Sequence, residues 1–133
     1  MRAELDRLRE RYGWAVLFDG HSIQSELPWL FEGKLPELNL GTADGTSCAP
    51  ELRARFVAIL AAHRGHTHAV DGRFKGGYIT RHYGRPADDV HAVQMEMCWH
   101  CYLHEPHDWD AGRAAHVQPV LKQIAEALIA WRP

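Results

Sequence analysis

The chain has 133 residues, in which 15 Lys and Arg side chains are balanced by 17 Asp and Glu side chains, so the formal net charge at pH 7 is -2. Such a length allows one domain that buries about two-thirds of the surface of its unfolded chain, and we expect residues 1–133 to form a single domain. The charge balance excludes the basic surface that binding to nucleic acid requires. Hydrophobic residues make up 46% of the chain, yet no apolar run approaches the roughly 20 residues of a membrane-spanning helix.

The cysteine and histidine contents bear on compartment and chemistry. Three cysteines, an odd number, agree with a reducing compartment. Residues 1–13 are highly charged and lack the apolar core of a signal peptide, so we expect a cytoplasmic protein with no membrane partner. Ten histidines are a high count, which leaves a metal site open without establishing one.

The first part of the chain predicts a helix, a strand and a long loop. Apolar residues recur on one stripe of residues 3–12, which predicts a helix ended by a glycine. The uncharged run that follows predicts a strand over residues 14–19, which Asp19-Gly20 terminates. Residues 20–50 have no convincing period, and we expect an irregular loop that is ordered by its large apolar residues.

His21 follows this predicted strand, with Ser22 next to it. Ligands and metals in open α/β sheets collect beyond the carboxyl ends of strands, so His21 lies where chemistry is usual. A histidine that simply caps a strand end is the alternative, and these residues alone favour it.

The second part of the chain predicts two helices with strands between them. Pro50 suits the first turn of a helix, which the apolar period extends over residues 50–63, with Ser47 as its candidate cap. Residues 67–70 predict a short strand, and an apolar stripe predicts a last helix over residues 110–131. The alternation of helices and strands predicts an α/β fold.

A short segment rich in glycine gathers groups that suit an anion. Gly76 and Gly77 would let backbone N–H groups approach a ligand closely. Arg73 and Arg81 could each hold a carboxylate through two parallel hydrogen bonds. The alternative is a solvated basic turn, which we favour for Arg85 and weigh evenly for the other two arginines.

Glu96 lies inside a predicted strand over residues 90–97, in which Met95 faces one side and Gln94 and Glu96 face the other. A buried carboxylate without a partner costs several kcal/mol, so Glu96 would need a partner or a catalytic task. The equally weighted alternative is that Glu96 points to solvent on the polar face of the strand. A carboxylate near a zinc-bound water could take its proton and pass it to a leaving amine.

The remaining histidines in local patterns have no carboxylate partner at a persuasive spacing, and they are His66, His68, His104 and His107. We expect these histidines to lie on the surface, with a break at Pro106 between the last two. Cys98 and Cys101 form a CxxC pattern after the strand that carries Glu96, and Cys48 lies in the long loop. The CxxC pattern has no second copy and is interpreted as incidental, and Cys48 as a small buried thiol.

Four motifs resemble the N-formylglutamate amidohydrolase family, in the same order and over nearly the whole chain. They are DGHSI at 19–23, LPELNLGTADGTSC at 35–48, GRFKGGYITRHYGRP at 72–86 and VHAVQMEM at 90–97. Members of this family are zinc hydrolases that split N-formyl-L-glutamate into formate and glutamate in histidine degradation. The resemblance implies an α/β fold related to zinc carboxypeptidases, in which helices flank a mixed sheet.

The resemblance also implies roles for single residues. His21 would be a zinc ligand, and Glu96 would act first as general base and then as general acid. The residues implied to hold the substrate carboxylates or the developing oxyanion are Arg73, Gly76, Gly77, Tyr78, Arg81 and His82, with Asn39 as a further polar contact.

Length is where the chain departs from the family, whose members are about twice as long. The resemblance places the other two zinc ligands, a histidine and a carboxylate, in a preceding half, and catalytic zinc generally needs three protein ligands. We therefore expect the carboxyl-terminal half of such a protein, with an incomplete core and with its other ligands outside this chain.

Three functions stay open for such a half. The chain could act in hydrolysis of N-formylglutamate, in a related deacylase of another N-acyl amino acid, or as a non-catalytic remnant that keeps part of the substrate site. An exposed sheet edge would favour association with the missing half or self-association.

Overall fold

A computed structural model describes residues 1–104 and 107–133, so the break expected at Pro106 lies outside the described residues. The helices are α1 (Arg2–Tyr12), α2 (Pro50–Ala62), α3 (Tyr78–Tyr83) and α4 (Ala111–Ala130), with two 3-10 turns, η1 (Pro86–Asp88) and η2 (Trp99–Cys101). The strands are β1 (Ala15–Ile23), β2 (Leu38–Gly41), β3 (His68–Val70), β4 (Val90–Cys98), β5 (Leu103–His104) and β6 (Asp108–Trp109). No helix among the described residues is long and apolar enough to cross a membrane.

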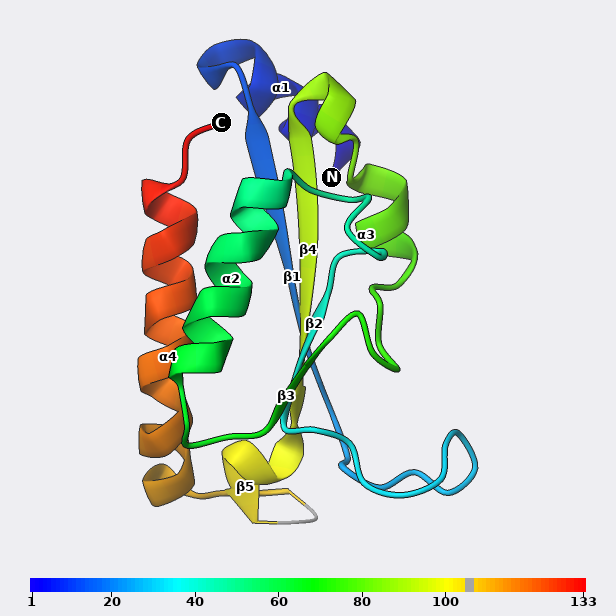
Figure 1. Ribbon diagram of the computed structural model, residues 1–133, viewed down its shortest axis with the longest axis vertical. Coiled ribbons are helices and arrows are strands. Elements are labelled where there is room, and N and C mark those ends of the chain that lie inside the picture. The colour runs from blue at the N-terminus through cyan, green and yellow to red at the C-terminus, as the bar shows by residue number, and fades with distance from the viewer. Residues whose placement is uncertain (105–106) are drawn as a thin grey trace.

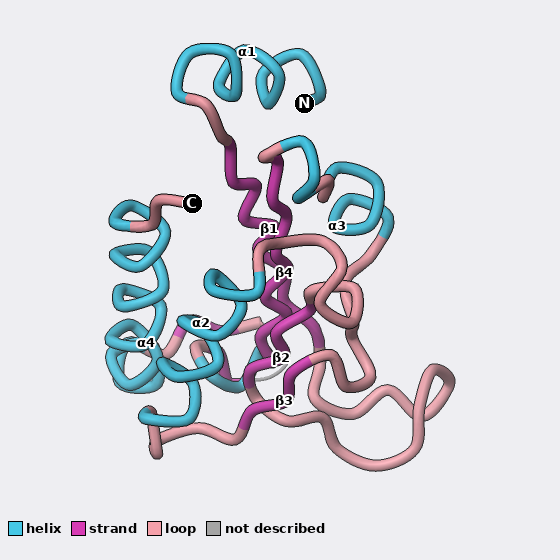
Figure 2. Tube along the Cα trace, turned by 45° about the horizontal axis from the view of Figure 1, so that its top comes forward, coloured by secondary structure: helices cyan, strands magenta, loops and turns pink. Residues whose placement is uncertain are grey.

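Four strands form a mixed sheet in the order β1-β4-β2-β3. β1 runs parallel to β4, β2 runs antiparallel to β4, and β3 runs parallel to β2. Helices α2 and α4 lie on one side of the sheet and α3 lies on the other (Figure 1). Figure 2 shows the strands through the centre and the long loop between β1 and β2 extending beyond them. The predicted α/β fold, with helices flanking a mixed sheet, is confirmed.

The main core lies between the sheet and the pair α2 and α4. Its strand side chains come from alternate positions, Leu38 and Leu40 of β2 and Val93 and Met95 of β4, which is the period that a half-buried strand requires. Phe56 of α2 is fully buried against them. The opposite face of the same strands is therefore left for polar side chains, and it carries the candidate site.

The structure corrects three local predictions in the first half of the chain. β1 does not end at Asp19-Gly20 but continues to Ile23, because each of its residues pairs with a residue of β4. The segment predicted as an irregular loop contains β2, which is only four residues long and therefore too short to show a period. Ser47 does not cap α2, since its hydroxyl donates to the carbonyl of Ala92 at 2.7 Å.

Candidate functional site

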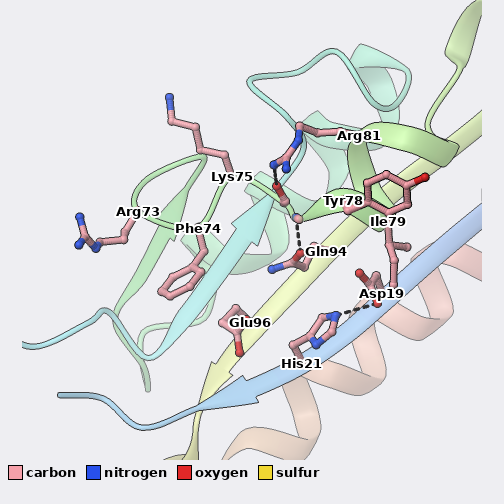
Figure 3. A pocket seen from close by; sticks show the side chains of 12 residues that line it. Asp19, His21, Arg73, Phe74, Lys75, Tyr78, Ile79, Arg81, Gln94 and Glu96 are labelled. Carbon is pink, nitrogen blue, oxygen red and sulfur yellow. Dashed lines mark hydrogen bonds and ion pairs between the residues drawn. The ribbon is translucent and has the colours of Figure 1, made fainter. Parts of the chain in front are cut away.

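A cavity of about 610 Å³ opens on the α3 side of the sheet (Figure 3). Its floor comes from polar positions of two neighbouring parallel strands, Asp19 and His21 of β1 and Gln94 and Glu96 of β4. Its wall comes from the chain between β3 and α3, residues 73–79, and from Arg81 on α3. The sheet thus brings together the histidine and the glutamate that the motifs single out.

His21 and Glu96 are direct partners in the register of β1 and β4. Asp19 lies two residues before His21 on the same face of β1, and its Oδ1 is 2.9 Å from His21 Nε2. Among the described residues, no hydrogen bond is made to the other ring nitrogen, Nδ1. A carboxylate on one nitrogen of an imidazole is the usual support of a metal-binding histidine, because it fixes the orientation of the ring.

Glu96 is buried, with only 7% of its surface exposed. Burial raises the pKa of its carboxyl; the His21 side chain opposes this and Asp19 adds to it. No hydrogen bond to its carboxylate is found among the described residues. The alternative that Glu96 points to solvent is therefore wrong, and a buried carboxylate with a raised pKa is suited to accept and return a proton.

The glycine segment is held against β4 by its backbone. The N–H of Gly77 donates to Gln94 Oε1 at 2.7 Å, and Arg81 donates through its guanidinium to the carbonyl of Gly76 (Figure 3). Gly76 has φ +100°, a backbone conformation that L side chains rarely adopt. These contacts fix Arg81 at the rim of the cavity.

Two further members of the predicted site line the cavity without pointing at its floor. Arg73 donates to the carbonyl of Leu30 and lies 5.2 Å over the ring of Phe31, so its guanidinium points away from His21 (Figure 3). Tyr78 is 65% exposed at the rim. Both side chains are long and partly exposed.

The cavity does not include Asn39 or His82. Asn39 is buried, and its amide donates to the carbonyl of Pro36 at 2.7 Å, a contact that holds the start of β2. His82 stacks on Tyr78 with ring centroids 4.7 Å apart, and its Nε2 lies 2.7 Å from an Arg2 nitrogen. Their predicted contacts with substrate stay predictions.

Five residues line the cavity without a role predicted from the motifs, namely Asp19, Phe74, Lys75, Ile79 and Gln94, and two of them, Asp19 and Gln94, lie on its floor. Each of these two lies two positions before a predicted site residue on the same strand, Asp19 before His21 and Gln94 before Glu96. The period of two along a strand would have identified both of them.

The donor set around His21 fits part of a zinc centre. Among the described residues, one group of three metal-ligating side chains has its ligand atoms within 4.8 Å of one another, namely Glu37, His66 and Cys101. His21 is outside that group, so its cavity offers an imidazole supported by a carboxylate but no compact set of three ligands. The expectation that the remaining ligands come from outside the chain stays a prediction.

Gly41 controls how closely the glycine segment approaches the sheet. A methyl group at Gly41 would lie 2.4 Å from the backbone nitrogen of Gly76, whereas one at Gly20 would meet nothing nearer than 3.8 Å. We expect Gly41→Ala to lower the free energy of unfolding by about 2 kcal/mol in urea titrations. The Gly77 amide should also exchange its hydrogen faster, because the glycine segment moves away from Gln94.

Gly20→Ala is the matched control, since both glycines lie in strands of the same sheet. It should leave stability unchanged or raise it by a few tenths of a kcal/mol, because alanine costs less backbone entropy than glycine. Equal stability of the two variants would contradict the close packing of Gly41 against Gly76.

Comparison with known proteins agrees with the motifs. A sequence profile described as N-formylglutamate amidohydrolase matches residues 1–103. The chain is 51% identical to an N-formylglutamate deformylase of Pseudomonas putida over 133 residues, covering 98% of this chain and 50% of the relative. It is 48% identical to the enzyme of the same name from Pseudomonas aeruginosa over 130 residues, covering 96% of this chain and 49% of the relative.

A solved structure shares the fold. The crystal structure of N-formylglutamate amidohydrolase from Ralstonia eutropha superimposes with a TM-score of 0.75 at 24% identity, over 92% of this chain and 45% of that chain. The chain thus spans about half the length of the curated relatives it matches. From the matched profile and the two relatives, the chain belongs to the N-formylglutamate amidohydrolase family.

Proposed function

We propose that this chain provides half of the active site of a cytoplasmic, zinc-dependent amidohydrolase that converts N-formyl-L-glutamate to formate and L-glutamate in histidine degradation. The observation that carries the proposal is the pairing of His21 with buried Glu96 across β1 and β4, in a cavity bordered by Arg81. The names of the two Pseudomonas relatives support the choice of substrate.

Different residues of this chain would bind the metal, orient its ligand and transfer the proton. His21 would hold the zinc ion, with Asp19 fixing its ring. The chemistry that zinc supplies when bound is polarisation of the formyl carbonyl and a lower pKa for the attacking water. Glu96 takes a proton from that water as it attacks the formyl carbon, and returns a proton to the amine nitrogen as the C–N bond breaks.

The two arginines account for the choice of a dicarboxylate. Arg81 lies at the rim of the cavity, and Arg73 reaches the same cavity from the segment after β3. Each guanidinium can bind one carboxylate of glutamate through parallel hydrogen bonds. Arg73 would exchange its contact with Leu30 for this one, and its exposed position makes that exchange inexpensive.

The complement of this half would dock along β1. β1 is an edge strand of the sheet, so the described residues leave its outer backbone groups without a strand partner. An apolar groove of about 290 Å³ runs beside it, lined by Leu8, Tyr12, Trp14, Val16, Phe18 and Ile129. A strand docked there would also approach His21, which lies in β1 itself.

Complementation tests the proposal. The chain is purified alone and together with the part of the Pseudomonas putida relative that this chain does not cover, and zinc content and formate release are measured. We expect the chain alone to be inactive and the pair to release formate from N-formyl-L-glutamate. His21→Ala should abolish both zinc binding at this centre and turnover of the pair.

Other outcomes would overturn specific parts of the proposal. A pair that binds zinc but cleaves only other N-acyl amino acids would assign a related deacylase. A stable pair with neither zinc nor turnover would make this chain a non-catalytic remnant. Self-association of the chain in light scattering, with no binding to the complementary polypeptide, would mean that a second copy of the chain occupies the groove beside β1.

A further inference from the structure

A second cluster of metal-ligating side chains lies at the other end of β2. Glu37 immediately precedes β2, His66 lies two residues before β3, and Cys101 ends the 3-10 turn that follows β4. β2 and β3 are parallel and β4 is antiparallel to them, so the starts of the first two strands and the end of the third meet. Topology alone therefore brings together three residues that are far apart in sequence.

The three side chains are close enough to share one ion. Their ligand atoms lie within 4.8 Å of one another, and Cys101 is buried while Glu37 and His66 are partly buried. They border a second cavity of about 650 Å³, which none of the residues around His21 lines. The sequence interpretation took His66 as an ordinary surface histidine and Cys101 as incidental, and the grouping of the two with Glu37 offers them a shared role.

Neighbouring groups already orient two of the three ligands. Glu37 Oε2 accepts from the backbone N–H of Thr67 at 2.7 Å, and its Oε1 lies 3.1 Å from His100 Nε2. His66 Nδ1 lies 2.9 Å from His63 Nε2, and its Nε2 has no hydrogen bond to the described residues. Such outer contacts are the usual support of metal ligands, because they fix the direction of the lone pairs.

The protonation states of His66 and Glu37 suit a cation, whereas Cys101 would have to lose its proton. Burial lowers the pKa of His66, which keeps its imidazole neutral and able to coordinate. Burial tends to raise the pKa of Glu37, but the hydrogen bonds from Thr67 and His100 outweigh it, so the carboxyl remains charged. Burial, Glu37 and Cys98 raise the pKa of Cys101 to about 12, so its thiol would lose a proton only to a bound metal.

We propose that Glu37, His66 and Cys101 form a second metal site, separate from the His21 cavity, which binds zinc or a divalent cation of similar softness. One sulfur, one nitrogen and one oxygen ligand favour zinc over magnesium or calcium, which prefer oxygen ligands alone. The cavity leaves a fourth position for water. The ion would tie the starts of β2 and β3 to the turn after β4, and so stabilise this end of the sheet.

Cobalt substitution of the purified chain tests the proposal without using activity. A thiolate bound to Co²⁺ gives a charge-transfer band in the near ultraviolet, which imidazole and carboxylate ligands do not give. We expect one equivalent of Co²⁺ to produce this band in the wild type and in His21→Ala. Cys101→Ser should lose it, and competition with Zn²⁺ should remove it from the wild type.

Two further variants keep the test independent of folding defects. Glu37→Gln keeps the shape of the side chain and should weaken Zn²⁺ binding by at least about 10-fold, the usual lower bound even for a supporting contact. Cys48→Ser is the matched control, because Cys48 is an equally buried thiol outside the cluster, and it should keep the band. Circular dichroism shows that each variant is folded.

Each of the following results would overturn the proposal of a second metal site. A band that survives Cys101→Ser, or that disappears in Cys48→Ser, would place the thiolate elsewhere. No band in the folded wild type at one equivalent of Co²⁺ would show that the cluster binds no such ion. Loss of the band in His21→Ala would mean that the two centres are one. Failure of the complementation experiment would contradict the proposed function but would not change the cobalt band expected from the second site.

Discussion

Glu96→Gln should lower kcat for formate release by about 100- to 10,000-fold in the complemented enzyme, the range that a general acid–base group contributes. Glutamine keeps the size of the buried side chain but cannot take a proton from water or return one to the leaving amine. KM should change little, because the groups proposed to bind the substrate carboxylates are Arg73 and Arg81. Steady-state kinetics with N-formyl-L-glutamate give both parameters.

Zinc content and a surface control decide what a loss of activity means. Glu126→Gln on α4 is the matched control, because this glutamate is exposed and pairs only loosely with Lys122 at 3.8 Å. It should retain full activity. If Glu96→Gln loses zinc together with activity, Glu96 acts as a ligand and not as the proton carrier. If its kcat stays within about 10-fold of the wild type, the proposed role is wrong.

The histidine at the centre of the site shows what local patterns can and cannot predict. The DGHSI motif singled out His21, but Asp19 and Gly20 predicted that the strand stops before it, so His21 was expected beyond the strand and not within it. In the structure β1 runs through them, because parallel pairing with β4 outweighs the turn preference of two residues. That pairing is long-range, and it is what places His21 opposite Glu96.

The two arginines show a second limit of prediction from sequence, which is the direction of long side chains. Both Arg73 and Arg81 were predicted near an anion, and both line the cavity, but their side chains point differently (Figure 3). Arg81 is fixed by the carbonyl of Gly76, five residues earlier in the chain, whereas Arg73 reaches across to Phe31 and Leu30. The direction of a long side chain depends on partners that composition and spacing do not reveal.

The cluster of Glu37, His66 and Cys101 is the largest departure from the sequence interpretation. No spacing rule joins residues so far apart, and the CxxC pattern directed attention to Cys98 and Cys101 as a pair. What joins the three is the order of strands, in which β2 lies between β3 and β4 and runs antiparallel to β4. The sequence predicted strands close to β3 and β4 but missed β2, so the meeting point could not be found.

Asp71→Asn should be the most destabilising of the conservative substitutions at the polar end of β2, lowering the free energy of unfolding by about 3 kcal/mol. Asp71 is 6% exposed as a side chain, and its carboxylate binds Arg53 at 2.9 Å. It also accepts from the backbone N–H and the hydroxyl of Thr42, both at 2.6 Å. The figure is at the lower end for a buried pair, because Arg53 remains partly exposed and its interaction is screened.

The dependence on pH gives an independent check of the same interaction. Burial tends to raise the pKa of Asp71, but hydrogen bonds from Thr42 and Arg53 lower it below its ordinary value of 3.8. The stabilisation is therefore complete above that value, where the unfolded carboxyl is also charged, and is lost as the pH falls through the lower pKa of the folded state. Asp71→Asn should have a flatter stability profile than the wild type below about pH 4.

Asp44→Asn is the control that separates this network from an ordinary surface charge. Asp44 also has a positive φ, +56° against +50° for Asp71, so asparagine suits both backbones equally. Its pair with Lys75 is 2.9 Å long but more than half exposed on both sides, so its loss should cost less than about 1 kcal/mol. Equal losses in urea titrations would contradict the network. A larger loss for Asp71 means that the loop after β2, and with it the wall of the His21 cavity, depends on one buried carboxylate.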